Sequence, residues 1–330
     1  MLVQLNKINL YFKKPPLGYK WIPGDRQLIY FIRKILGLNK VGGIERVFVN
    51  LCKGFDKLNV SYNINKEFSK IQPGEPVVVL GAGKISLQGY DQPNPVIAGI
   101  GLMTHPNEWP GLFSKYPVAK YLQHSDWTNN IYKRHFGENN CEIWPAGIDT
   151  EHWQPGSNSK KSNDVLIYNK IMWSKEETSK NLRKPIIESL NKMGLSHKEI
   201  VYGEYKGAAY YDFLQQSRAM IFLCEHESQG FACCEALSMN VPVFAWDQGY
   251  WLDPNRFKWN DPVIPATSVP FFDERCGMKF KDIDGFKHKI AEFWQKVKEE
   301  KFSPRKYILE NLTLEKSAER MLEIINEVYQ

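Results

Sequence analysis

Apolar residues of this chain occur in two patterns, short continuous runs and longer segments with helical spacing. Short runs bounded by turn residues predict buried parallel strands, and such runs lie at 8–12, 77–80, 96–103, 142–144, 165–168, 200–202, 219–223 and 241–246. Helices are predicted at 44–58, 126–136, 208–216, 231–239, 284–298 and 313–329. The alternation of strands and helices predicts an α/β protein with mainly parallel sheets and helices on both faces.

The length of the chain indicates two domains, because 330 residues exceed the size at which a single core stops growing. The segment 154–163 is rich in Pro, Gly, Ser and Asn and lies between two strand-like runs, which is typical of a linker. We therefore expect one domain over 1–155 and a second over 156–310. The remaining segment, 311–330, carries the last predicted helix.

Composition narrows the class of protein. Hydrophobic residues make up 43% and aromatic residues 13% of the chain, which is enough for two packed cores and excludes a disordered protein. The six cysteines show no paired metal-binding spacing, so we expect reduced thiols in a cytosolic protein. Neither a signal peptide nor a stretch of transmembrane length is recognisable, which favours the cytoplasmic side of a membrane.

The net charge of +6 is modest, and Lys and Arg are spread along the chain. This distribution argues against a nucleic-acid partner and fits an anionic small ligand or an anionic lipid surface. The segment 26–40, RQLIYFIRKILGLNK, is both basic and strongly apolar. Two interpretations stay open for it, peripheral contact with the inner face of a membrane and an ordinary helix packed on its own domain.

Two glutamates around a glycine turn are the strongest chemical signal. Glu227 follows an apolar strand, and Glu235 lies one turn into the next predicted helix, with seven residues between them. Gly230 permits close backbone approach, and the helix start at Phe231 directs free N–H groups towards the edge of the sheet. That arrangement suits an anionic ligand. The oxygens of Glu235 can accept hydrogen bonds from a vicinal diol such as a ribose.

This motif resembles the glutamate pair of retaining glycosyltransferases of family 4. The matching residues are Glu227, Gly230, Phe231, Glu235, Ala236, Leu237, Pro242 and Val243, although Ser228-Gln229 precede the glycine here. The stretch from Pro145 to Asp149 also resembles the segment that closes the first domain of these enzymes. The resemblance implies a GT-B fold, in which two Rossmann-like domains flank a cleft and the final helix, 311–330, packs back on the first domain. It also implies that Glu227 contacts the sugar and that Glu235 binds the ribose.

Three further residues, Gly43, His105 and Lys170, match positions that carry function in family 4. Gly43 belongs to Gly-Gly-Ile-Glu-Arg before a helix, where backbone N–H groups can approach a phosphate or a sugar. His105 follows an apolar run, at the position of a histidine near the donor sugar. Lys170 ends a strand where a basic residue facing the diphosphate is usual, and Lys175 or Lys180 can supply a second cation.

The resemblance therefore implies a hexosyltransferase that acts with retention and without a metal ion. The donor is expected to be a nucleotide-diphosphate sugar, with UDP or GDP as the nucleotide, and no other cofactor is expected. The acceptor is a glycan, a lipid-linked molecule or a small molecule, held by the first domain. A nucleotide-sugar epimerase of the same architecture and a non-catalytic sugar-binding scaffold remain alternatives. A dinucleotide oxidoreductase ranks low, because Gly81-Ala82-Gly83 lacks the third glycine of its fingerprint.

Overall fold

The computed structural model describes residues 7–14, 42–156, 161–205, 207–259 and 261–330. The basic segment 26–40 and part of the predicted linker lie outside these described residues. The chain divides into two compact units. Unit 1 is drawn from 1–123, 129–144 and 318–330, and unit 2 from 124–128 and 145–317.

Unit 1 is built on a six-stranded parallel sheet with the order β2-β1-β3-β4-β5-β6. Its strands are β1 (Ile8–Tyr11), β2 (Tyr62–Ile64), β3 (Val77–Leu80), β4 (Val96–Gly99), β5 (Val118–Gln123) and β6 (Cys141–Ile143). Its helical segments are α2 (Gly43–Lys57), η1 (Phe68–Lys70), η2 (Lys84–Ser86), η3 (Pro106–Glu108), α3 (Leu112–Lys115), most of α4 (Asp126–Phe136) and η4 (Glu138–Asn140).

Unit 2 is built on a five-stranded parallel sheet with the order β11-β10-β9-β7-β8. Its strands are β7 (Asn163–Lys170), β8 (His197–Val201), β9 (Ser217–Cys224), β10 (Val243–Trp246) and β11 (Gly277–Phe280). Its helical segments are α5 (Lys175–Thr178), the π-helical turn η5 (Ser179–Arg183), α6 (Lys184–Lys192), α7 (Gly207–Gln216), α8 (Phe231–Ser238), η6 (Pro254–Trp259), α9 (Ile283–Lys298) and α10 (Pro304–Asn311).

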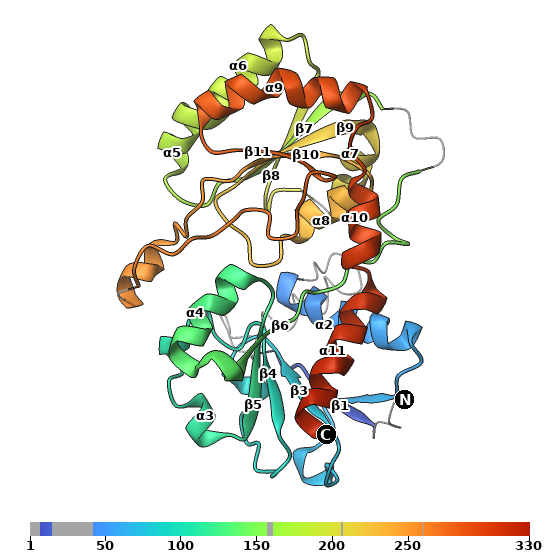
Figure 1. Cartoon of the computed structure of the whole chain (residues 1–330), viewed down its shortest axis with the longest axis vertical. Helices are drawn as coiled ribbons and strands as arrows, with labels where there is room; N and C mark the ends of the chain where they lie inside the picture. Colours follow the sequence, from blue (N-terminus) through green and yellow to red (C-terminus); the bar gives the residue numbers. More distant parts are fainter. Residues whose placement is uncertain (1–6, 15–41, 157–160, 206, 260) are drawn as a thin grey trace, which may run out of the picture. The chain divides into compact units, whose positions relative to one another are not determined.

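Helices cover both faces of the unit 2 sheet, α6 and α9 on one face and α7, α8 and α10 on the other (Figure 1). The central strand β9 is apolar from Ala219 to Cys224 because alternate side chains enter the two cores. Ile221 and Leu223 pack under α6 and α9, whereas Met220 and Phe222 pack under α7 and α8. Such a strand fixes the register of its neighbours, since every position from Ala219 to Cys224 is buried.

Close packing between strands requires a glycine at the start of β11. Gly277 has φ of +142°, and a Cβ atom there would lie 2.0 Å from the carbonyl oxygen of Val243. Only a residue without a side chain fits against β10 at that distance.

Arg305 of α10 ties three backbone segments of unit 2 together. Its guanidinium donates hydrogen bonds to the carbonyl oxygens of Thr150 at 3.1 Å, Trp153 at 3.0 Å and Ser238 at 2.6 Å. Through these bonds, α10 holds the end of α8 and the segment that leads into unit 2. The glutamate-bearing helix is thereby anchored at its carboxyl end.

The last helix, α11 (Leu314–Tyr329), begins in unit 2, and its residues from Ala318 onward belong to unit 1. Within unit 1, the hydroxyl of Tyr329 accepts a hydrogen bond from the N–H of Val77 at 3.0 Å and donates one to the carbonyl of Pro95. Arg320 donates to Glu142 at 2.9 Å. The expectation that the C-terminal helix crosses back to the first part of the chain is confirmed.

The predicted strands and helices are all present, with shifts at their ends. The run 96–103 forms a strand only as far as Gly99, because Ile100 has a left-handed φ of +36° that ends the extended backbone. Strand β7 begins at Asn163, inside the predicted linker. The sequence did not predict β2, β5, β11, α3, α5, α6 and α10. Among the described residues, no helix combines the length and the apolar character needed to cross a membrane.

Candidate functional site

The candidate site lies at the carboxyl edge of the unit 2 sheet, where parallel α/β sheets bind ligands. Lys170, the last residue of β7, pairs in register with Cys224, the last residue of β9. The loop 225–230 follows β9 and leads into α8. Gly230, at φ +70° and ψ 48°, makes the left-handed turn from that loop into the helix. The register of two buried strands thus places the cation beside the glutamate loop.

Lys170 and Glu227 form an ion pair at this edge. The distance from Nζ of Lys170 to Oε1 of Glu227 is 2.5 Å, and the two side chains are 20% and 14% exposed. The ammonium group also lies 4.7 Å from the centre of the Tyr202 ring. Burial by itself would lower the pKa of Lys170, but the Glu227 carboxylate outweighs burial and raises this pKa above its usual value. The lysine is therefore a permanent cation at neutral pH.

The backbone of Glu227 is fixed from two sides within unit 2. Its N–H donates to the carbonyl of Thr267 at 3.0 Å, and its carbonyl accepts from the indole N–H of Trp127 at 2.8 Å. The thiol of Cys224 lies 3.6 Å from Oε1 of the same glutamate. These contacts hold the carboxylate in one place at the edge of the sheet.

Glu225 is a buried carboxylate that the sequence did not single out. It is 2% exposed and accepts hydrogen bonds from the backbone N–H groups of Met172 at 2.9 Å and Trp173 at 3.1 Å. Burial raises the pKa of Glu225, although these N–H donors act in the opposite direction. The carboxylate joins the loop after β9 to the loop after β7, so its role is to shape the site.

His226 lies between tryptophans. Its ring stacks on Trp173, with centroids 5.0 Å apart, and meets the Trp127 ring edge-on at 5.5 Å. Burial lowers the pKa of His226 to about 4, with the positive charge of Lys170 acting in the same direction and Asp253 opposing it. Among the described residues, the buried Nε2 atom has no hydrogen-bond partner. The imidazole is therefore neutral at physiological pH and works as an aromatic packing element next to Glu227.

The remaining predicted residues of unit 2 lie around the start of α8 and α5. Glu235 is on the second turn of α8 and only 3% exposed. Phe231, the first residue of α8, is half-buried against the core on the sheet face covered by α7, α8 and α10. Lys175 begins α5 and is exposed, as is Lys180 in the following π-helical turn. The contacts place Lys170, and not Lys175, against Glu227.

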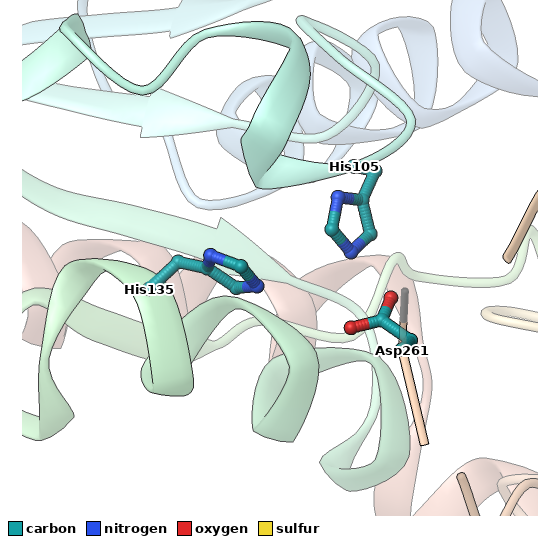
Figure 2. A group of neighbouring side chains, drawn as sticks. All are labelled: His105, His135 and Asp261. Atoms are coloured by element: carbon teal, nitrogen blue, oxygen red, sulfur yellow. The ribbon is translucent and has the colours of Figure 1, made fainter. Parts of the chain in front are cut away.

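The predicted residues of unit 1 lie at the carboxyl edge of its own sheet. His105 is fully buried and caps η3, and its Nδ1 accepts a hydrogen bond from the N–H of Asn107 at 3.2 Å. Figure 2 shows its ring edge-on to that of His135, with centroids 5.2 Å apart. Asp261, also labelled there, belongs to unit 2. Gly43 is the first residue of α2, and a Cβ atom there would meet no atom of the described residues within 4 Å.

Solved structures resemble this chain over most or nearly all of its length, among them these three. AviGT4, a glycosyltransferase involved in avilamycin A biosynthesis, is 15% identical with a TM-score of 0.55, over 98% of both chains. WaaB, a lipopolysaccharide outer core galactosyltransferase in its apo form, is 11% identical with a TM-score of 0.53, over 98% of this chain and 100% of its own. WaaG, a glycosyltransferase involved in lipopolysaccharide biosynthesis, is 9% identical with a TM-score of 0.50, over 87% and 97%.

No protein-family model and no curated protein matches the chain. At these identities the three structures establish the fold alone. The two parallel sheets, the helices on their faces and the helix that returns to unit 1 make this chain an α/β protein with the GT-B fold.

Proposed function

We propose that this protein is a glycosyltransferase that moves a hexose from a nucleotide-diphosphate sugar to an acceptor. The observation that carries the proposal is the Lys170–Glu227 ion pair at the carboxyl edge of the unit 2 sheet, beside the start of α8. A cation, a helix start and a fixed carboxylate together suit a ligand that has both a diphosphate and a sugar. The GT-B fold supports this function by analogy.

Lys170 is the residue proposed to face the diphosphate. Phosphate oxygens can replace the Glu227 carboxylate on the ammonium group without leaving the lysine buried and unpaired, a state that would be costly. As the bond to the sugar breaks, the same charge stabilises the departing nucleoside diphosphate. This role is the basis for proposing that the reaction needs no metal ion. Lys175, exposed at the start of α5, is the proposed second cation.

The carboxylates are proposed to bind the sugar and the ribose. Glu227, once a phosphate shares Lys170, accepts hydrogen bonds from hydroxyl groups of the transferred sugar. Glu235 accepts hydrogen bonds from the ribose. Because only 3% of Glu235 is exposed, the ribose must approach the helix start closely. Gly230 has no side chain to prevent this approach, and the first N–H groups of α8 near Phe231 then face the ligand.

Unit 1 is proposed to hold the acceptor, which is a glycan, a lipid-linked molecule or a small molecule. His105 supplies an imidazole for a hydroxyl group of the donor sugar and helps to stabilise positive charge at the anomeric carbon. The helix start at Gly43 contributes backbone N–H groups. By the family 4 resemblance, transfer proceeds with retention of configuration, and the leaving phosphate helps to deprotonate the acceptor. We place the enzyme on the cytoplasmic side of a membrane.

A thermal-shift panel of UDP, GDP, ADP and CMP with their common sugar conjugates tests the donor site. A ligand at a hundred times its dissociation constant stabilises the protein by about 2.7 kcal/mol. One nucleotide should stabilise the wild type but not Glu235→Gln or Lys170→Met. Glu274→Gln, at an exposed glutamate of unit 2, is the matched control and should respond like the wild type. Failure of every nucleotide to stabilise the wild type would refute the proposed donor site.

Product analysis then separates the remaining alternatives. Incubation with the preferred donor alone converts it to an isomeric nucleotide sugar if the protein is an epimerase. Release of the nucleotide only when an acceptor is added supports a transferase. Tight nucleotide binding with no turnover under either condition identifies a non-catalytic sugar-binding scaffold.

A further inference from the structure

Gln229 stands in the glutamate loop, 225–230, directly before the glycine turn into α8. The residue is buried, with 4% of its surface exposed. Its side-chain amide makes two hydrogen bonds to the backbone of one residue. Oε1 accepts from the N–H of Ala146 at 2.8 Å, and Nε2 donates to the carbonyl of Ala146 at 3.0 Å. Because both ends of this buried amide are bonded to the backbone, the side chain is not placed to contact a ligand.

The backbone that receives this amide is itself held within unit 2. The carbonyl of Pro145 accepts a hydrogen bond from Oγ of Ser317 at 2.8 Å. The N–H of Ile148 donates to the carbonyl of Leu312 at 2.7 Å. Both bonds reach the stretch of chain that joins α10 to α11 or the first turn of α11. The segment 145–148 is therefore a fixed support for the glutamate loop.

The backbone of Gln229 leads directly into the first turn of α8. Gly230 follows in a left-handed conformation, with φ of +70°. The thiol of Cys234, in α8, lies 3.7 Å from the carbonyl oxygen of Gln229, and the N–H of Cys234 donates to the carbonyl of Gly230 at 3.0 Å. The first N–H groups of a helix have no acceptor within the helix. Their direction in α8 depends on this turn, which the Gln229 side chain ties to Ala146.

A second glutamine of unit 2 makes a similar pair of bonds at the other end of β9. Oε1 of Gln215 accepts from the N–H of Gly156 at 2.9 Å, and Nε2 donates to the carbonyl of Gln154 at 3.0 Å. Gln215 lies just before β9 begins at Ser217, whereas Gln229 follows the carboxyl end of this strand. The two glutamines therefore allow a purely structural role to be separated from a role in donor binding.

We propose that Gln229 is a positioning residue for the donor. By fastening the glutamate loop to Ala146, it holds the Gly230 turn and the start of α8 in the orientation that receives the diphosphate. This inference rests on the proposed function, because it assigns the helix start to a nucleotide-diphosphate sugar. A ligand that binds only the attached loop also disfavours detachment of the loop. Exchange of the Ala146 amide hydrogen reports on detachment, since its acceptor is Oε1 of Gln229.

Residue-resolved hydrogen exchange of the full wild-type chain tests this link, with UDP, GDP and ADP as probes. The nucleotide that binds should slow exchange at Ala146, by up to about a hundredfold when present at a hundred times its dissociation constant. Exchange at Gly156, whose N–H donates to Gln215, should be the same with and without nucleotide. In Gln229→Met, exchange at Ala146 should be faster than in the wild type and should not depend on nucleotide.

Calorimetric titration of the variants with the same nucleotide measures the effect on affinity. Gln229→Met should bind it about tenfold more weakly, the equivalent of one or two hydrogen bonds. Gln215→Met, the matched control, also loses two bonds to the backbone but should bind as the wild type does. Thermal unfolding shows whether each variant is folded.

Two results would overturn the role of Gln229 and leave the proposed donor site standing. One is nucleotide binding that does not change exchange at Ala146 in the wild type, which needs no variant. The other is equal nucleotide affinity of Gln229→Met and the wild type. Absence of binding of every nucleotide to the wild type would instead refute the donor site, and this inference with it.

Discussion

Protonation of His226 should cost stability as the pH falls from 7 to 5. The ring is packed between Trp173 and Trp127, and its pKa is lowered from 6.5 to about 4 by burial first and by Lys170 to a smaller extent. Between these two pKa values the unfolded chain binds more protons than the folded one. Stability therefore rises with pH in this window. The contribution is fully present above pH 6.5 and is lost as the pH falls towards 4.

The size of the effect follows from the two pKa values. Their difference of about 2.5 corresponds to at most about 3.4 kcal/mol. At pH 7 the imidazole is largely neutral in both states, whereas at pH 5 it is protonated almost completely only in the unfolded chain. Integration between these pH values gives a loss of about 2 kcal/mol from this one group. Nearby Asp253 opposes this shift in the pKa of His226.

Urea unfolding of the wild type and His226→Phe at pH 7 and pH 5 measures this contribution. Phenylalanine keeps an aromatic ring between the tryptophans but cannot be protonated. The variant should lose about 2 kcal/mol less than the wild type between the two pH values. His288→Gln, at an exposed histidine of α9, controls for removal of an imidazole from the chain. If His226→Phe loses as much stability as the wild type between the two pH values, the conclusion that His226 is buried in its neutral form is wrong.

Three other experiments test the unit 2 framework by urea unfolding. Lys170→Met and Glu227→Gln, combined in a double-mutant cycle, should show a coupling of about 2 kcal/mol because the ion pair is largely buried. Purely additive effects would contradict the pair. Arg305→Lys should lower stability by about 2 kcal/mol, since one ammonium group cannot bond three separate carbonyls. An unchanged urea midpoint for Arg305→Lys would contradict a stabilising role for these three hydrogen bonds. Gly277→Ala should lower stability by about 3 kcal/mol or more, because its Cβ would clash with β10. Wild-type stability of Gly277→Ala would disprove the close packing of β11 against β10.

The sequence predicts well those elements in which the pattern of apolar residues matches the burial of the element. Strand β9 is a continuous apolar run because both of its faces are covered, and α8 follows a glycine that makes a left-handed turn. Strand β5 escaped prediction because Lys120 interrupts its pattern, its ammonium group reaching the carbonyl of Asn139. Strand β11 begins with a glycine that is dictated by the neighbouring β10 backbone. Both interruptions are consequences of tertiary contacts.

The same distinction applies to the candidate site. The sequence alone singles out Glu227 and Lys170. Their contact depends on the register of β7 against β9, which is set by pairing between strands that are far apart in the sequence. Glu225 looks like one more polar loop residue. Its hydrogen-bond donors are the N–H groups of Met172 and Trp173, more than fifty positions earlier in the chain. No local sequence pattern therefore indicates that Glu225 is buried.

The two carboxylates of the glutamate loop differ in what a ligand can do to them. Glu225 is held by the backbone N–H groups of Met172 and Trp173, and displacing the carboxylate would break both hydrogen bonds. Glu227 is held by Lys170, whose ammonium group can donate hydrogen bonds to a phosphate as readily as to a carboxylate. In the proposed reaction, the incoming diphosphate exchanges with Glu227 and leaves Glu225 in place. The loop would then keep its shape while the Glu227 carboxylate becomes free to bind hydroxyl groups, which is the division of roles that the proposed sugar transfer requires.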